Sequence, residues 1–233
     1  MCRVVITGPP GSGKGTQGAR LAERLAVPHI SSGDILRRIL AGDSEPEYFA
    51  DSAFSAEMVR AARVIREGKM VSDSIASALV LNELSKPGAQ RGFLLDGYPR
   101  NVAQAETLGR FLGGRGLTLD AVVALEVSEA VLVERLSHRL TCTNCGASYH
   151  ARWNPPAREG VCDVCGSELT TREDDRPESI RVRFGVYHEG TEPVLAYYRE
   201  RGLLRVVDAE GAEDEVFGRV LGEVLRDAAA RPS

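Results

Sequence analysis

Short apolar runs alternate with amphipathic stretches along the chain. The apolar runs are rich in β-branched residues, which is typical of strands buried on both faces of a parallel sheet. The stretches between them carry apolar side chains at intervals of three and four, the spacing of a helix with one buried face. We expect strands at residues 4–6, 27–30, 93–95, 121–127 and 204–207, and helices at 15–25, 55–67, 73–84, 129–139, 181–201 and 213–229. This alternation predicts an α/β fold with a parallel sheet.

The first predicted strand ends in a glycine-rich turn, Gly8-Pro-Pro-Gly-Ser-Gly-Lys14, which opens the first predicted helix. A G-x-x-x-x-G-K pattern between a strand and a helix predicts a phosphate-binding P-loop. Backbone N–H groups and the helix N-terminus attract phosphate, and Lys14 can reach the β- and γ-phosphates. Gly15 replaces the usual Ser or Thr that holds Mg²⁺, and Thr16 follows. We therefore expect phosphate oxygens, water and a carboxylate elsewhere to hold Mg²⁺.

A second polar segment follows the predicted strand at 93–95, which ends in Asp96. Open parallel sheets bind ligands at the carboxyl ends of their strands. Asp96 is therefore the candidate that replaces the missing hydroxyl and holds Mg²⁺ through its water shell. Arg100 can clamp a phosphate group with its fork of N–H donors, which no lysine reproduces. Gln104 carries a donor and an acceptor, so it can contact an adenine edge.

Four cysteines form two close pairs, Cys142-x₂-Cys145 and, sixteen residues later, Cys162-x₂-Cys165. This spacing indicates a zinc ribbon, in which four thiolates surround Zn²⁺ tetrahedrally. Four protein ligands leave no position for water, so the metal should be structural and should supply the folding free energy of a segment too small for its own core. Two disulfides are the alternative, which a reducing cytoplasm disfavours.

Composition narrows the choice of partners. The 233 residues are 43% hydrophobic, enough for a sizeable core, and carry a formal net charge of −4. That charge gives no reason to expect nucleic-acid or anionic-membrane binding. No apolar run approaches the roughly 20 residues of a membrane span, and the N-terminal residues lack a signal-peptide pattern. We therefore expect a cytoplasmic protein with no nucleic-acid or membrane partner.

Several separated segments resemble motifs of the adenylate kinase family. They are the P-loop at 8–16, Ile-Ser-Ser-Gly-Asp-Ile-Leu-Arg at 30–37, Gly-Lys-Met-Val-Ser-Asp at 68–73 and Gly-Phe-Leu-Leu-Asp-Gly-Tyr-Pro-Arg at 92–100. The resemblance spans residues 2–225 and is weakest between 41 and 66. It implies a P-loop three-layer α/β/α core with a five-stranded parallel sheet, a helical NMP-binding insert and a zinc-ribbon lid. The implied boundaries are 1–31, 74–137 and 177–233 for the core, 32–73 for the insert and 138–176 for the lid.

The same resemblance implies reversible, Mg²⁺-dependent phosphoryl transfer from ATP to AMP, giving two ADP, by a monomer with a structural Zn²⁺. The implied catalytic residues are Lys14, Asp96, Arg100, Arg139, Arg172 and Arg183. The implied ATP-binding residues are Gly11, Ser12, Gly13, Lys14, Gly15, Thr16, Arg135, Arg139 and Val206. The implied AMP-binding residues are Ser32, Arg37, Val71, Gly97, Arg100, Gln104, Arg172 and Arg183. The implied metal ligands are Cys142, Cys145, Cys162 and Cys165.

The chain departs from the family pattern at the start of the lid, where His138-Arg139-Leu140 replaces Gly-Arg-Arg. At the lid exit, Asp174 and Asp175 are expected to orient the neighbouring arginines. A kinase for another monophosphate, such as UMP or GMP, is one alternative, although the zinc-ribbon lid and Gln104 favour AMP. A nucleotide-binding regulator with an inactive site is another, supported by the departures at the lid and at 41–66.

Overall fold

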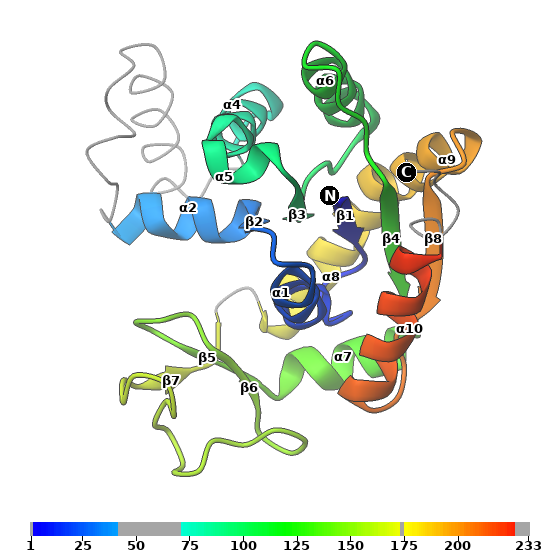
Figure 1. The fold of residues 1–233 in the computed structure, drawn as a ribbon. Helices are drawn as coiled ribbons and strands as arrows, with labels where there is room; N and C mark the ends of the chain where they lie inside the picture. Colours follow the sequence, from blue (N-terminus) through cyan, green and yellow to red (C-terminus); the bar gives the residue numbers. More distant parts are fainter. Residues whose placement is uncertain (1, 42–70, 173–174, 227–233) are drawn as a thin grey trace.

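The computed structural model describes residues 2–41, 71–172 and 175–226. Its main sheet has five parallel strands in the order β2-β3-β1-β4-β8 (Figure 1). The strands are β1 (Arg3–Thr7), β2 (His29–Ser31), β3 (Phe93–Asp96), β4 (Ala121–Glu126) and β8 (Leu204–Asp208). All five predicted strands are present. Because β1 and β3 are neighbours, the P-loop and Asp96 leave the sheet side by side.

Helices cover both faces of this sheet (Figure 1). They are α1 (Lys14–Leu25), α2 (Ser32–Ala41), α4 (Asp73–Ser85), α5 (Pro87–Gln90), α6 (Val102–Gly113), α7 (Glu129–Ser137), α8 (Pro177–Val186), α9 (Glu192–Glu200) and α10 (Glu213–Leu225). Val4 and Ile6 pack with residues of α1 and α10, whereas Val5 packs with residues of α4, α6 and α9. Successive strand residues point to opposite faces, so one strand supplies both cores. The predicted three-layer α/β/α fold is confirmed.

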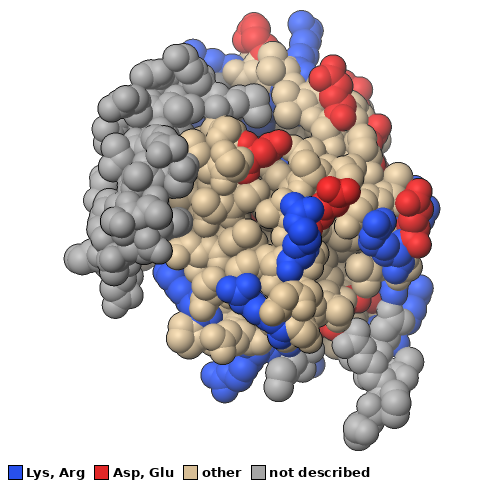
Figure 2. Space-filling view, turned by 90° about the horizontal axis from the view of Figure 1, so that it is seen from above, with Lys and Arg blue, Asp and Glu red and all other residues tan. Residues whose placement is uncertain are grey.

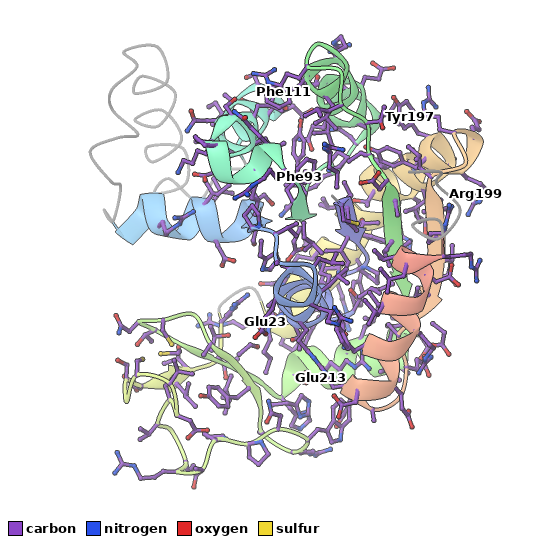
Figure 3. The ribbon with its side chains drawn as sticks, viewed as in Figure 1. Glu23, Phe93, Phe111, Tyr197, Arg199 and Glu213 are labelled. Carbon is purple, nitrogen blue, oxygen red and sulfur yellow. The ribbon has the colours of Figure 1, made fainter. Side chains whose placement is uncertain are left out.

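Side chains between the sheet and the helices are buried, whereas those on the outer faces of the helices point to solvent (Figure 3). Phe93 lies among the sticks between the sheet and α4, in agreement with its exposed fraction of 1%. Arg199 points outward from the end of α9. On the face seen from above, basic and acidic side chains are interspersed (Figure 2). Among the described residues, no helix is long and apolar enough to span a membrane.

Two predicted helices differ from the structure. The helix expected at 129–139 ends at Ser137 as α7, and Arg139 already begins a strand. The helix expected at 181–201 is divided by a π-helical turn, η3 (Tyr187–Thr191), between α8 and α9. A tertiary contact accompanies this division: a Cβ on Gly190 would lie 3.0 Å from the carbonyl oxygen of Arg100. The helix expected at 55–67 lies outside the described residues.

The four-cysteine segment forms a second, antiparallel sheet in the order β6-β5-β7, apart from the main sheet (Figure 1). Its strands are β5 (Arg139–Cys142), β6 (Ser148–His150) and β7 (Leu169–Thr170). The buried cluster of this segment contains Cys142, Tyr149, Cys162 and Leu169. The chain enters it from α7 and leaves it toward α8. We refer to this segment, residues 138–176, as the lid.

Candidate active site

The P-loop joins β1 to α1 through a turn that only glycine adopts without strain at two positions. Gly11 and Gly13 have φ values of +84° and +88°, in the left-handed region that disfavours other residues. Ser12 between them is 1% exposed, and its Oγ has no hydrogen-bond partner among the described residues. A buried, unpaired hydroxyl fits a site that receives a polar ligand. Lys14 donates from Nζ to the carbonyl oxygen of Pro9 over 3.2 Å.

Lys14 is the point on which the charged groups of the site converge. Burial lowers the pKa of the Lys14 ammonium to about 8, and the carboxylate of Asp96 opposes that shift. Three guanidinium groups lie near enough to lower the Lys14 pKa further, those of Arg183, Arg100 and Arg139. These groups come from separate segments of the sequence. The fold therefore places three guanidinium groups near Lys14 of the P-loop, an arrangement suited to a polyphosphate.

Asp96, the last residue of β3, lies against the first turn of α1. An ideal Cβ on Gly15 would stand 3.8 Å from its Oδ2 atom, so the carboxylate adjoins the position where other P-loops carry a hydroxyl. Burial raises the pKa of Asp96, while Lys14 and His29 lower it. His29 Nε2 lies 3.8 Å from Oδ2, a neighbour that sequence reasoning missed. The register of β2 and β3, which only the fold shows, places His29 opposite Leu94 and therefore on the same face of the sheet as Asp96.

A second group of polar contacts surrounds the carbonyl oxygen of Gly97. This oxygen accepts from Ser32 Oγ and from Arg100 Nε, each over 2.8 Å. Gly97 has a φ of +76°, and a Cβ there would lie 2.7 Å from Ser32 Oγ. Ser31 takes the capping role by accepting from the N–H of Asp34 over 3.3 Å. Ser32 is therefore available to fix the segment that carries Arg100.

Gln104 is engaged with the protein itself. Its Oε1 accepts from the N–H of Arg100 over 2.8 Å, and its Nε2 donates to Asp73 Oδ1 over 2.7 Å. The side chain is 4% exposed. It thus connects the Arg100 segment to the first turn of α4. Sequence reasoning missed Asp73 as this partner, because the two residues lie on different helices and meet only in the fold.

Asp175 binds two arginines, Arg139 at the start of β5 and Arg183 in α8. Its carboxylate, 0% exposed, accepts from Arg139 Nε over 2.7 Å and from Arg139 Nη2 over 2.5 Å. It also accepts from Arg183 Nη1 over 3.1 Å. Arg172 Nε donates instead to Thr141 Oγ1 over 3.0 Å. Asp174, expected to act with Asp175, lies outside the described residues.

Arg135, near the end of α7, joins the P-loop to the segment after β8. Its Nη2 donates to the carbonyl oxygen of Ala209 over 2.9 Å, and its Nη1 lies 3.5 Å from that of Ser12. Burial lowers the pKa of Arg135. Val206 lies in β8 opposite Ala124, with 44% of its surface exposed. The fold thus brings Arg135 to the P-loop and leaves Val206 on the outer strand.

Three further predicted nucleotide-binding residues, Thr16, Val71 and Arg37, lie on α1, before α4 and on α2. Thr16 is exposed in the first turn of α1. Val71 is partly buried against the core cluster ahead of α4. Arg37 belongs to α2, and its side chain lies outside the described part of the structure.

The four lid cysteines lie together. Their Sγ atoms are all within 4.8 Å of one another, and none of them forms a disulfide. Behind each pair, a glycine N–H donates to the carbonyl of the first cysteine, from Gly146 over 3.2 Å and from Gly166 over 2.8 Å. Four sulfur donors in this arrangement are compatible with a structural zinc ion.

A P-loop at the carboxyl edge of a parallel sheet, cations gathered from separate segments and a separate lid define a nucleotide-binding phosphotransferase class. The family model for adenylate kinase matches residues 6–203. A protein named adenylate kinase from Streptomyces coelicolor is 44% identical, covering 97% of this chain and 99% of its own length. Another from Moorella thermoacetica is 45% identical, over 94% and 98%. The chain belongs to the adenylate kinase family, the nucleoside monophosphate kinases that use Mg²⁺-ATP to phosphorylate AMP.

Proposed function

We propose that this chain transfers the terminal phosphoryl group of ATP to AMP and catalyses the reverse reaction from two ADP. The observation that carries the proposal is the convergence of Arg100, Arg139 and Arg183 on Lys14 of the P-loop. Phosphoryl transfer passes through a transition state whose negative charge is spread over several oxygens, so catalysis depends on positioning and positive charge. The site supplies both, and the reaction requires no protein nucleophile.

On the donor side, we assign the phosphates of ATP to the P-loop and Lys14, with Arg139 on the same phosphates. The unpaired Oγ of Ser12 supports this assignment, since a bound phosphate would complete its hydrogen bonding. Arg135 and the backbone after β8 form the side on which we place the adenine. The proposed ATP-binding residues are Gly11, Ser12, Gly13, Lys14, Gly15, Thr16, Arg135, Arg139 and Val206.

On the acceptor side, we assign the monophosphate of AMP to Arg37 and Arg100, and its nucleoside to the surface near Ser32, Val71, Gly97 and Gln104. Arg100 is fixed through Gly97 and Gln104, which supports a defined position for the phosphate. If the Gln104 amide contacts adenine, it must exchange its present bonds to Asp73 and Arg100 for that contact. Arg172 and Arg183 are proposed to approach the transferring group when the lid closes, which also excludes water.

We place Mg²⁺ beside Asp96, which would hold it through water. When bound with ATP, Mg²⁺ neutralises charge on the β- and γ-phosphates. The proximity of Asp96 to Lys14 and to the first turn of α1 supports this placement. We propose structural Zn²⁺ at Cys142, Cys145, Cys162 and Cys165.

We further propose that the chain divides into a core at 1–31, 74–137 and 177–233, a monophosphate-binding insert at 32–73 and the lid at 138–176. The separate sheet of the lid supports the last of these boundaries. A monomeric, cytoplasmic enzyme without nucleic-acid or membrane partners follows from the family resemblance, and it too is a proposal.

A coupled assay of ADP formation from ATP, with AMP, UMP, CMP and GMP as acceptors, tests the function. We expect AMP to be the best acceptor, a requirement for Mg²⁺, and one zinc per chain by metal analysis. A higher rate with UMP or GMP would assign the enzyme to another monophosphate. Binding of ATP and AMP without ADP formation would identify a regulator instead.

A further inference from the structure

One arginine of α10 binds the turn between β8 and α10, residues 208–211, at two backbone positions. Arg219 donates from Nη1 to the carbonyl oxygen of Asp208 and from Nη2 to that of Glu210, each over 2.6 Å. Its Nη1 also lies 3.0 Å from the Asp208 carboxylate. A single guanidinium therefore spans the turn and fixes the orientation of the Asp208–Ala209 and Glu210–Gly211 peptide groups.

Ala209, the residue between those two positions, is bound by Arg135, which also reaches the P-loop. Ala209 is fully buried, its carbonyl oxygen accepts from Arg135 Nη2 over 2.9 Å, and its N–H donates to Glu126 over 2.8 Å. Three successive carbonyl groups thus accept hydrogen bonds from guanidinium groups of two different helices. Arg135 also reaches the P-loop at Ser12. Arg135 therefore connects the turn to the P-loop, and hydrogen bonds hold the three carbonyl groups of residues 208–210.

Gly211 provides the space for this contact. A Cβ at Gly211 would lie 3.2 Å from Arg219 Nη2 and 2.9 Å from Glu215 Oε2, and the residue has a φ of +104°. A larger side chain at this position would push the guanidinium away from the turn. The contact of Arg219 with the turn therefore requires a glycine at position 211, eight residues before it.

We propose that Arg219 is a positioning residue for the base of ATP, acting through the backbone of residues 208–211. The inference rests on the proposed function, which places the adenine beside Arg135 and this turn. A nucleobase recognised by peptide groups binds best when those groups are already oriented, because ordering them on binding costs affinity. Arg219 supplies this order from the side of α10. A lysine cannot reproduce it, because one ammonium lacks the planar fork that reaches two carbonyls.

The test compares Arg219→Gln with Arg20→Gln. Arg20 also contacts α10, through ion pairs to Glu213 and Asp214 at 3.0 and 2.6 Å, and both of these partners lie in the first turn of the helix, beyond residues 208–211. Steady-state kinetics would give KM for ATP and for AMP, and calorimetry would give the affinities for ATP and for inorganic tripolyphosphate, which carries no base.

For Arg219→Gln we expect KM for ATP to rise about tenfold, with KM for AMP, kcat and tripolyphosphate affinity within about twofold of the wild type. The KM for ATP of Arg219→Lys should lie between those of the wild type and Arg219→Gln. Arg20→Gln should lower the melting temperature and leave KM for ATP unchanged. An unchanged KM for ATP in Arg219→Gln, or an equal loss of ATP and tripolyphosphate affinity, would overturn the proposal.

Two further outcomes keep this inference separate from the proposed function. If Arg219→Gln fails to fold, Arg219→Lys carries the same comparison, and an ATP affinity equal to that of the wild type would then refute the role. If the wild type forms no ADP, the proposed function fails, while the ATP and tripolyphosphate titrations still decide whether Arg219 acts on base binding.

Discussion

The main sheet and the lid achieve a defined structure by different means. In the core, Val4, Val5 and Ile6 of one strand pack into two large apolar clusters, one on each face of the sheet. In the lid, the buried cluster has four members, and two of them, Cys142 and Cys162, belong to the sulfur site. Apolar burial therefore determines the core, whereas the lid buries a small apolar cluster and places four sulfur donors together, an arrangement compatible with a structural metal.

The two regions also contribute differently to the candidate site. The core supplies Lys14, Asp96 and Arg100, which are fixed by strands, turns and short hydrogen bonds. The lid supplies Arg139, whose position depends on a buried carboxylate shared with Arg183 of α8. Asp175 therefore connects the two regions, because its carboxylate binds both Arg139 of the lid and Arg183 of the core helix α8. Four changes, ordered by expected size, test this contrast.

The largest effect is expected in the core. Lys14→Ala should lower kcat/KM by at least about 10³-fold, because it removes the cation at the centre of the phosphate site. The fold should remain intact, since removing an ammonium whose pKa burial lowers also removes its desolvation cost. The measurement is the coupled assay together with thermal melting, with Arg24→Ala, an exposed position on the same helix, as control. Turnover near that of the wild type would remove the P-loop assignment.

The connection between the regions comes next. Asp175→Asn removes the charge that two arginines share in a fully buried position, and breaking a buried ion pair destabilises by about 3–5 kcal/mol. We expect kcat to fall about 100-fold, because Arg139 and Arg183 lose their common position. Chemical denaturation and steady-state kinetics measure both effects. Asp214→Asn, an exposed ion-pair partner of Arg20, is the matched control, and equal behaviour of the two variants would contradict the role of Asp175.

A smaller effect is expected from the lid metal. Replacing Cys142 and Cys145 with serine should release zinc, lower the melting temperature of the lid and reduce turnover by about tenfold. Far-ultraviolet circular dichroism should retain the helical signal of the core. Cys2→Ser, which lies outside the lid, is the control for thiol loss. Unchanged zinc content in the double variant would exclude the four-sulfur site.

Local sequence patterns were sufficient where a single segment determines the structure. The strand–turn–helix of the P-loop, the paired cysteines and the strand that ends in Asp96 all have their chemistry within a few neighbouring residues. Contacts between distant segments were not predictable in this way. The π-helical turn at Tyr187–Thr191 lies against the carbonyl of Arg100, and the bond of Gln104 to Asp73 joins two helices. In both cases the deciding partner is far away in the sequence.

Ser128 shows the same limit on a smaller scale. It stands at the N-cap of α7, a position where serine is commonly found, but its side chain makes no capping hydrogen bond. Its N–H donates instead to Glu210 Oε1 over 2.8 Å. A carboxylate from the turn after β8 thus binds the start of this helix, which no property of residues 128–139 indicates.

The smallest expected effect concerns the pH dependence of the core site. Burial lowers the pKa of Lys14 from 10.5 to about 8 in the ligand-free protein. Polyphosphate binds the ammonium form, so ATP affinity should be independent of this group below pH 8 and should fall above it, by about fourfold at pH 8.5. Above pH 8 ATP carries its full charge and adds no titration of its own. Titration calorimetry between pH 7 and 9.5 measures the change.

Stability should change in the opposite direction over the same range. The pKa of Lys14 is lower in the folded than in the unfolded protein, so the unfolded chain binds more protons between about pH 8 and 10.5. The contribution of Lys14 to the free energy of unfolding therefore rises with pH in this window, while ATP affinity falls. Lys14→Arg keeps its charge throughout and should flatten both profiles. A flat ATP affinity in the wild type would show that the ammonium of Lys14 is not in contact with the phosphates. Phosphate binding in the core would then depend on groups other than Lys14.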